Sequence, residues 1–524
     1  MTVEELGTVL AEDGEADVGC SLQENPPPNG FGLIWGQGIP DVAPLVYLPP
    51  AAQIPFYLDK YAQRVDPHIK ILHLPTESAS FLAYGDVSAR TSKAPTPLIF
   101  AMCYSATASL SDEECKRELG EDKRTLLLKY KLATQYSLQK ASLLRTKDIS
   151  VLQAFLLFLC SLPGTESEEL WPMSGLALRV AQQMGLHRDG SHFALSPFTV
   201  EMRRRLWWQI CFFDLMASER CGVECTTLDM AFDTHPPLNV RDNDLSPNMQ
   251  NLPEVSLEYT EITCSLIRFE MVRLLRRLKP VAVIAGGLVH KERCVADFAE
   301  NIFNTYLHPR NSEHPLFLIG TAVFRFLLSK IWLLLYRPFR SLRHGLELPH
   351  EIVDRLFTSS LECLESGQAI MTDPRVSQRS VLFRSPRQWH QLCYVLLQLL
   401  DGRDDDFARR AWETITELSL PPLDSSPDSK TSLLLRPLHE LMAPAREIRM
   451  GAATVGENHA RDAHELSPGR VSELVSCTGG NETSSERQNA FVMPEFSVDD
   501  STLPWSEWQA VWDEFDTGVI WEDA

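Results

Sequence analysis

Apolar residues recur at helical spacing through most of the chain between residues 50 and 449. Leu176, Val180 and Met184, for example, are four residues apart, which places them on one face of a helix. Gly185 follows at the position where a left-handed C-terminal cap favours glycine. Convincing runs of alternating strand-like residues do not occur in this region. The pattern predicts an all-α, irregular multi-helix domain of stacked antiparallel helices.

Several segments of this region carry the helical pattern, and their connections contain Pro, Gly, Asp and Ser. The predicted helices are 54–65, 98–109, 125–145, 149–160, 172–184, 197–218, 255–278, 289–306, 320–334, 349–372, 385–400 and 405–418. The helix at 197–218 begins with Ser196 as its N-cap and Pro197 at its first position. The short connection between 149–160 and 172–184 predicts a helix hairpin.

The composition changes at both ends of the helical region. Residues 1–49 are acidic and contain a Pro run and several Gly residues, which predicts a disordered N-terminal arm. Residues 450–489 are rich in Gly, Ser, Glu and Asn and predict a flexible linker. Residues 490–524 combine acidic and aromatic residues and contain no Lys or Arg. The chain is therefore expected to consist of an arm, a helical domain at 50–449, a linker and an acidic tail.

Four aromatic residues of the tail fall on one face of a predicted helix. Trp505, Trp508, Trp512 and Phe515 have this spacing, acidic residues surround them, and Trp521 follows. Repulsion among the acidic groups keeps such a segment expanded, so a partner with an apolar groove and a basic rim can bury the aromatics. This composition is typical of an acidic transcriptional activation domain. The alternative is a C-terminal helix that packs on the chain's own domain.

The net charge of −21 means that the protein as a whole is not attracted to the phosphate backbone of nucleic acids. Contact with DNA would need a local basic patch or a partner protein. The acidic N-terminal residues lack the basic and apolar stretch of a signal peptide. The most apolar stretch, 316–336, contains Arg325 and Lys330 and predicts a buried helix. We expect a cytosolic or nuclear protein without membrane contact.

The 12 cysteines do not form a recognisable metal site. A structural zinc site needs four converging thiolate or imidazole ligands, which normally appear as two close pairs in the sequence. Only Cys221 and Cys225 are close together, and most of the others lie in apolar helix patterns. The sequence therefore predicts reduced thiols, no bound metal and no recognisable cofactor.

Patterns that resemble catalytic motifs are incomplete in this chain. His187, Arg188 and Asp189 match the first letters of a protein-kinase catalytic loop, but Ala194 occupies the position of the required Asn. No nucleophile elbow, phosphate-binding loop or zinc-protease motif occurs. We predict a protein that is not an enzyme and has no catalytic residue. The alternative is a metabolic enzyme with an all-α fold.

One acidic residue, Asp214, lies within an apolar helix pattern. A buried carboxylate is costly unless it is paired, and Arg203, Arg204 and Arg205 occur earlier in the same predicted helix. Our hypothesis is a buried ion pair between Asp214 and this arginine triplet that joins stacked helices. The alternative is an active-site carboxylate.

Many of these residues also occur together in the order of a known family. The matching pieces are Gly185, His187, Arg188, Arg204, Arg205, Trp207, Trp208, Asp214, the Pro-Leu-Asn-Val sequence at 237–240 and, upstream, the segment 67–73. Together they resemble the fungal-specific transcription factor domain, the middle homology region of binuclear zinc-cluster regulators, over residues 50–420. After Ser218 this chain has Arg220-Cys221-Gly222 where the family usually has Gly-Arg-Pro.

The resemblance implies a nuclear regulator of transcription, with 50–449 as its regulatory domain and 490–524 as a tail that recruits the transcription machinery or a co-activator. Family members often control metabolic or secondary-metabolite genes. The resemblance therefore implies the same class of target genes for this protein. The family's six-cysteine zinc cluster is not found in these 524 residues. DNA would then be contacted through an upstream segment outside this sequence, or through a partner in a homodimer or a heterodimer with a zinc-cluster regulator. The alternative is a co-regulator or repressor that does not bind DNA and pairs with an intact zinc-cluster protein.

Overall fold

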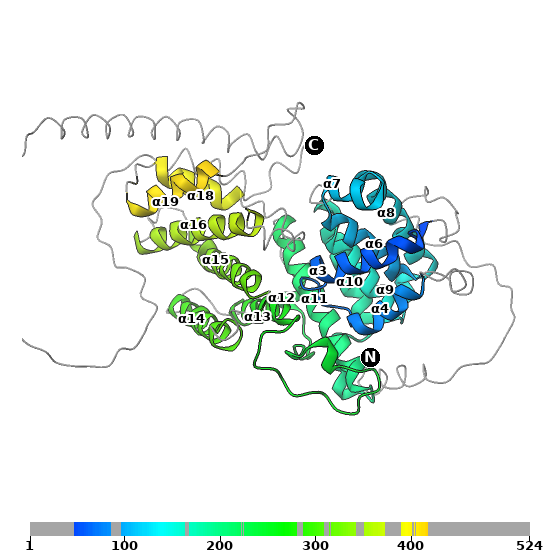
Figure 1. The fold of residues 1–524 in the computed structure, drawn as a ribbon. Coiled ribbons are helices and arrows are strands. Elements are labelled where there is room, and N and C mark those ends of the chain that lie inside the picture. Colours follow the sequence, from blue (N-terminus) through cyan, green and yellow to red (C-terminus); the bar gives the residue numbers. More distant parts are fainter. Residues whose placement is uncertain are drawn as a thin grey trace, which may run out of the picture. The chain divides into compact units, whose positions relative to one another are not determined.

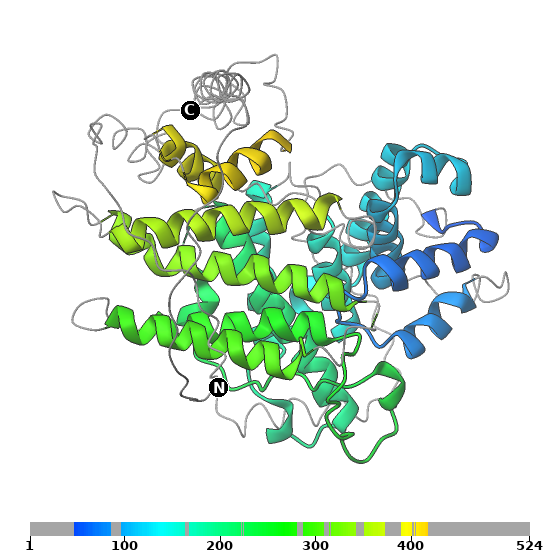
Figure 2. The same ribbon diagram turned by 60° about the vertical axis from the view of Figure 1, so that its left-hand side comes forward.

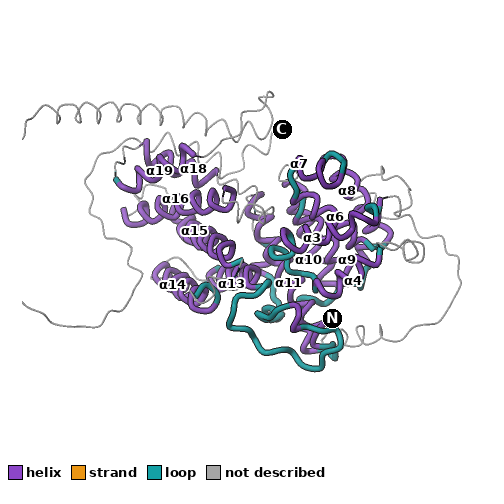
Figure 3. Tube along the Cα trace, in the orientation of Figure 1, coloured by secondary structure: helices purple, strands orange, loops and turns teal. Residues whose placement is uncertain are grey.

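The computed structural model of the 524-residue chain describes residues 47–84, 96–162, 167–221, 223, 225–279, 287–308, 314, 316–341, 350–372, 389–400, 403 and 405–417. The chain divides into two compact units, residues 1–388 and 389–524. Every regular element in the described ranges is a helix (Figure 3), so the all-α prediction is confirmed there. The predicted arm up to residue 46, the linker at 450–489 and the tail at 490–524 lie outside the described residues, and so do the aromatic residues Trp505, Trp508, Trp512, Phe515 and Trp521.

The α-helices of the first unit are α3 (Ile54–Arg64), α4 (Leu74–Ala83), α6 (Pro97–Ser109), α7 (Asp112–Glu114), α8 (Lys123–Lys140), α9 (Ile149–Cys160), α10 (Ser167–Gln183), α11 (Pro197–Cys221), α12 (Thr226–Asp229), α13 (Thr263–Leu278), α14 (Gly287–Thr305), α15 (Phe317–Ser341) and α16 (His350–Thr372). Short 3-10 helices are η3 (Ala51–Gln53), η5 (Leu143–Arg145), η7 (Gly190–His192) and η8 (Asp242–Asp244), and η4 (Cys115–Leu119) is a π-helix. In the second unit, α18 (Trp389–Leu400) packs against α19 (Asp406–Glu417).

Helix α9 forms the core of the N-terminal part of the first unit. Its side chains from Val151 to Leu159 are all buried, because α9 contacts α6, α8, α10 and α11 on different sides. The Asp148 carboxylate caps the helix by accepting a hydrogen bond from the Ser150 N–H at 2.8 Å. The observed helix has the bounds that the sequence predicts, and it packs against α10, its expected partner.

Helix α11 connects two groups of helices within the first unit. It contacts α9 and α10 on one side and α12 and α13 on another, and Figure 1 shows it between the cyan helices and the green ones. Helices α13, α14, α15 and α16 pack side by side in the green group (Figure 2). One described segment, Phe317–Leu335 in α15, is long and apolar enough to cross a membrane by length and composition alone, and half of it is buried in the protein.

Several helices differ from the sequence prediction, among them α13, α10 and α4. The segment 255–262 was predicted as helical, but the helix α13 begins only at Thr263, because the side chain of Asn239 holds the preceding residues in a loop. Helix α10 begins at Ser167, and Pro172 therefore lies inside it and not at its start. Helix α4 was not predicted, since only one of its side chains, Phe81, is buried and its apolar pattern is short.

Candidate functional site: a buried charge network

Four charged side chains in the first turns of α11 are buried inside the protein: Glu201, Arg203, Arg204 and Arg205. The helix begins as predicted, because the Ser196 Oγ accepts a hydrogen bond from the Thr199 N–H at 3.3 Å. Burying a charged group is costly unless it is paired, so the contacts of these four residues determine what the site can do.

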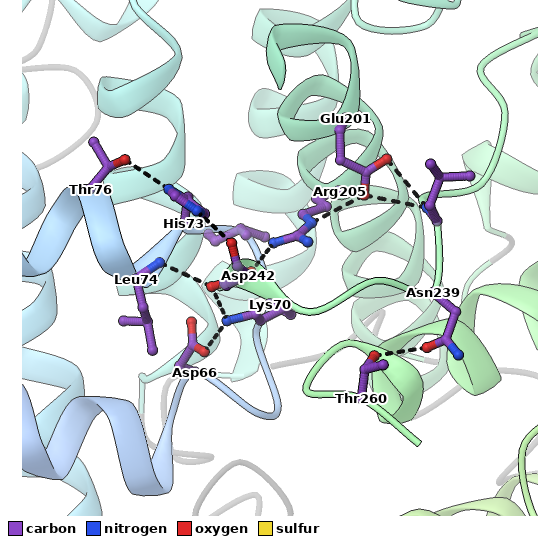
Figure 4. A network of polar contacts seen from close by, with 12 residues as sticks. Asp66, Lys70, His73, Leu74, Thr76, Glu201, Arg205, Asn239, Asp242 and Thr260 are labelled. Atoms are coloured by element: carbon purple, nitrogen blue, oxygen red, sulfur yellow. Dashed lines mark hydrogen bonds and ion pairs between the residues drawn. The ribbon is translucent and has the colours of Figure 1, made fainter. Parts of the chain in front are cut away.

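Arg205 lies at the centre of the network in Figure 4. Its Nη1 donates to Asp242 Oδ1 at 2.7 Å and its Nε donates to Glu201 Oε1 at 3.2 Å. Although burial alone lowers the pKa of the Arg205 guanidinium, the two carboxylates outweigh this effect and raise it. Glu201 also accepts hydrogen bonds from the Leu238 N–H at 3.3 Å. The guanidinium therefore ties α11 to η8, and its glutamate partner ties α11 to the loop before η8.

Besides Arg205 of α11, Asp242 contacts three groups from the segment 70–74. Its second oxygen, Oδ2, accepts from Lys70 Nζ at 2.6 Å and from the Leu74 N–H at 3.0 Å (Figure 4). The His73 Nε2 lies 2.9 Å from the Asp242 carbonyl oxygen. Burial works in the opposite direction, but Lys70 and Arg205 hold the pKa of the Asp242 carboxyl at about 2. Asp242 thus joins η8, α11 and the segment that leads into α4.

A second carboxylate, Asp66, completes this network. It is 1% exposed and pairs with Lys70 one helical turn away. Burial raises the pKa of the Asp66 carboxyl to about 7 against the opposing effect of Lys70, and the negative charge of Asp242 adds to the rise. One Asp66 oxygen, Oδ1, has no hydrogen-bond partner. The pKa of Asp66 therefore lies near neutral pH, in contrast to that of Asp242.

Arg204 forms a separate buried ion pair with Asp189. The pair has two parallel hydrogen bonds of 2.8 Å, from the guanidinium Nε and Nη2 to the two carboxylate oxygens. Asp189 also accepts from the backbone N–H groups of Ser191 and His235, at 3.0 and 2.8 Å. Burial opposes the shift, but these donors hold the pKa of Asp189 well below its usual range. Asp189, the residue that mimics a kinase catalytic aspartate, thus orders the loop that follows α12.

The turn after α10 has the geometry that the sequence predicts. Gly185 has a φ of 71°, the left-handed conformation of a helix C-terminus, and the Leu186 N–H donates to the Ala181 carbonyl oxygen at 2.9 Å. Arg203 reaches back from α11 and donates to the Met184 carbonyl oxygen at 2.9 Å. This contact satisfies one of the carbonyl groups that the helix end leaves open.

The next two residues of this turn contact the loop after α12. The His187 carbonyl oxygen accepts from the Asp233 N–H at 3.2 Å, and Arg188 forms an ion pair with Asp233 at 2.9 Å. Burial lowers the pKa of His187. Both residues therefore support the turn.

Two tryptophans of α11 pack against the same loop. Trp207 and Trp208 are buried, and each meets Phe232 edge to face, with ring centroids 5.2 and 5.5 Å apart. The Trp208 indole N–H donates to the His235 carbonyl oxygen at 2.9 Å. Phe232 is also stacked by Arg276 of α13, whose guanidinium carbon lies 3.6 Å from the ring centroid. The two tryptophans thus connect α11, the loop and α13.

The predicted ion pair between Asp214 and the arginine triplet is wrong. Asp214 is buried, but its carboxylate accepts hydrogen bonds from the Thr227 hydroxyl at 2.7 Å, the Thr227 N–H at 3.0 Å and the Ser174 hydroxyl at 3.1 Å. The Cys225 Sγ lies 3.3 Å from it. Nine residues separate Arg205 from Asp214, which is about 13 Å along a helix axis, so the two side chains cannot meet. Asp214 instead ties α11 to α10 and α12.

Asn239 was part of the resemblance, but its role was not predicted. Its amide NH2 donates to the carbonyl oxygens of Ser256 and Glu258 at 2.8 and 2.9 Å, and its Oδ1 accepts from Thr260 and Thr263 at 2.8 and 2.9 Å. A single amide thereby fixes a long loop to the start of α13. The sequence signal was the Asn/Asp-rich turn that follows two prolines.

The buried charges of this site hold helices and loops together. Its charged groups are buried and directed at one another, so each acid or base is already paired with another side chain or with backbone. No group of three or more metal-ligating side chains is found among the described residues. Of the two close cysteines, Cys225 is buried beside Asp214, and burial raises its pKa to about 12. The expectation that the whole chain binds no metal or cofactor stays a prediction.

Comparison with known proteins places the network inside a recognised domain. Residues 58–303 match the family described as the fungal specific transcription factor domain. The aurofusarin cluster transcription factor of Gibberella zeae is 32% identical over 367 residues, 68% of this chain and 54% of the relative. The pyriculol/pyriculariol biosynthesis cluster transcription factor 1 of Pyricularia oryzae is 36% identical over 194 residues, 36% of this chain and 25% of the relative. A C6 finger domain transcription factor of Aspergillus niger is 27% identical over 389 residues, 68% of this chain and 49% of the relative. This chain spans about half the length of the first and third of these relatives.

Proposed function

Because this chain belongs to the proteins with a fungal specific transcription factor domain, we propose that it is a pathway-specific regulator that controls a fungal secondary-metabolite gene cluster. The observation that carries the proposal is the similarity over two thirds of the chain to a relative named as a cluster transcription factor. The buried network agrees with this role, because it joins helices and offers no open acid–base pair for catalysis. The protein would act in the nucleus.

In this proposal the two parts of the chain have different tasks. The helical domain provides a rigid body, since Arg205, Asp242 and Lys70 fix segments that are far apart in the sequence. The acidic tail at 490–524 recruits the transcription machinery or a co-activator through its aromatic residues. Neither task makes or breaks a covalent bond, and the proposed protein is therefore not an enzyme.

DNA is reached either by a zinc cluster outside the present sequence or through a partner. Relatives named for a C6 finger domain support a zinc-cluster mode of binding in this group. Within these 524 residues only Cys221 and Cys225 are close in sequence, and the net charge is −21. The net charge favours, as a second candidate function, a co-regulator that pairs as a heterodimer with an intact zinc-cluster protein, because this chain as a whole is not attracted to a phosphate backbone.

Transcript profiling tests the proposal. Strains that lack the gene, express it, or express the Trp508→Ala/Trp512→Ala variant would be compared under identical growth conditions. The proposal predicts that transcripts of one group of neighbouring biosynthetic genes change on deletion and are not restored by the variant. Equal transcript levels in all three strains, with the wild-type and variant proteins present at equal amounts in the two strains that express them, would refute it.

A further inference from the structure

Positive charge is concentrated in one segment of this acidic protein. Between residues 123 and 147 there is no Asp or Glu, although the whole chain has a net charge of −21. The basic residues of the segment are Lys123, Arg124, Lys129, Lys131, Lys140, Arg145 and Lys147. This segment comprises α8 and η5. Such a local reversal of charge provides a favourable surface for a negatively charged partner.

The first half of helix α8 buries one face and leaves the opposite face open to solvent. Leu126, Tyr130 and Ala133 are buried, and the helix packs against α6 and α9 on this side. The other face carries Arg124, which is exposed, and Leu128, whose side chain is 58% exposed. Figure 1 shows α8 beside α6, at the outside of the cyan helices.

The outer face of α8 therefore combines an apolar centre with basic surroundings. Lys131 and Leu132 are half-buried and follow Leu128 at the next turn of the helix. Residues three and four positions apart are neighbours on a helix surface, so Arg124, Leu128 and Lys131 form one continuous stripe. A single exposed aliphatic side chain is ordinary on a protein surface, but one that lies between basic side chains matches a partner that offers both an apolar contact and carboxylates.

We propose that this stripe binds an acidic amphipathic helix of a partner protein. Leu128 and Leu132 would contact the apolar stripe of the partner helix, and Arg124 and Lys131 would pair with carboxylates at its edges. Nucleic acid fits this surface less well, because a phosphate backbone pairs with the cations but leaves the exposed leucine without an apolar contact.

The test uses the full-length protein and a fluorescein-labelled synthetic peptide of about 18 residues, with Leu at helical spacing on one face and Glu elsewhere. Fluorescence anisotropy would measure its binding to the wild type, to Arg124→Glu/Leu128→Glu, and to the control Arg179→Glu/Leu257→Glu. The control changes the net charge equally at two exposed positions outside α8. A peptide with the same composition but a scrambled order, and a duplex DNA, serve as competing ligands.

We expect the α8 variant to bind the amphipathic peptide at least about tenfold more weakly than the wild type, while the control variant binds normally. The scrambled peptide should bind weakly to all three proteins, because charge alone does not cover Leu128. Equal binding of both peptides to the wild type, or loss of binding in both variants, would overturn the proposal. If DNA bound more tightly than the peptide and this binding depended on Arg124, the partner of the stripe would be a nucleic acid and not an acidic helix. If the wild type self-associated and only the α8 variant did not, the partner would be a second copy of this chain.

Discussion

Arg205 and Asp242 meet inside the protein with 2.7 Å between the guanidinium Nη1 and the carboxylate Oδ1, although they are 37 residues apart in the sequence. Arg205 is fully buried and Asp242 is 5% exposed. Through Lys70 and Leu74, the same carboxylate also holds the segment that leads into α4. This pair is the point at which three parts of the helical domain are joined.

Asp242→Asn should destabilise the domain by about 3–5 kcal/mol, because it leaves the buried charges of Arg205 and Lys70 without their shared counter-ion. The loss would be measured as a lower midpoint in urea unfolding followed by circular dichroism. Asp244→Asn is the matched control, since this residue lies in the same 3-10 helix but is exposed. A similar midpoint for the two variants would show that the network contributes little.

The protonation of Asp66 should make the stability depend on pH between mildly acidic and neutral conditions. The pKa of this carboxyl is about 7 in the folded protein and 3.8 in its ordinary state, so the folded form binds the proton more tightly. The free energy of unfolding should therefore fall as the pH rises between these values, by at most about 1.4 kcal/mol for each pH unit.

The variant Asp66→Asn cannot titrate and should give a flatter stability profile than the wild type between about pH 5 and pH 7, inside the interval between the two pKa values. Urea unfolding at several pH values measures both profiles. Asp242 does not interfere in this window, because its pKa is about 2 and its contribution is lost only under acidic conditions. Parallel profiles for the two proteins would mean that Asp66 is ionised throughout the range.

Gly320→Ala should destabilise the packing of α15 on the loop before α13. A Cβ atom at this position would lie 2.1 Å from the Tyr259 hydroxyl oxygen, which no real contact allows. Overpacking of this kind costs about 1–3 kcal/mol. Gly175→Ala in α10 is the control, because its Cβ would meet nothing within 4 Å and alanine favours helices. In thermal unfolding, the midpoint temperature should fall for Gly320→Ala and rise for Gly175→Ala. Adding Tyr259→Phe to Gly320→Ala should restore part of the lost stability.

The acidic tail should activate transcription when it is moved to another protein. A fusion of residues 488–524 to an unrelated DNA-binding domain is expected to activate a reporter gene, because its aromatic face is available to co-activators. Trp508→Ala/Trp512→Ala should lose most of this activity, whereas Ser506→Ala, off the aromatic face, should keep it. A silent fusion, beside a working acidic tail in the same assay, would argue against recruitment.

Local features of the fold could be predicted from the sequence, because they depend on neighbouring residues. Helix α9 combines a capping Asp148 with an unbroken apolar run, and Gly185 occupies a position that its neighbours mark as a helix end. The N-cap Ser196 is similarly local. The helix at 74–83 was not predicted, because it buries a single large side chain, Phe81, and one buried residue gives no helical spacing to recognise.

The partners of the buried charges could not be predicted in the same way. The arginine triplet was predicted to pair with Asp214, but Arg205 pairs with Asp242 and Arg204 with Asp189. Arg203 donates to the Met184 carbonyl oxygen. Asp214 was assigned to the wrong donors, because the hydroxyls of Ser174 and Thr227 have no charge that marks them in a sequence. These pairings depend on which loop residues pack against which helix in the folded chain. The spacing of hydrophobic residues does not specify these contacts.

Mapping the tagged full-length protein on chromatin tests the central claim most directly. The account predicts occupancy at the promoters of one biosynthetic gene cluster whose transcripts change when the protein is removed. Occupancy would be direct, or it would depend on a zinc-cluster partner. Exclusion from the nucleus, or a nuclear protein with no enrichment at any promoter in either the presence or the absence of such a partner, would contradict it.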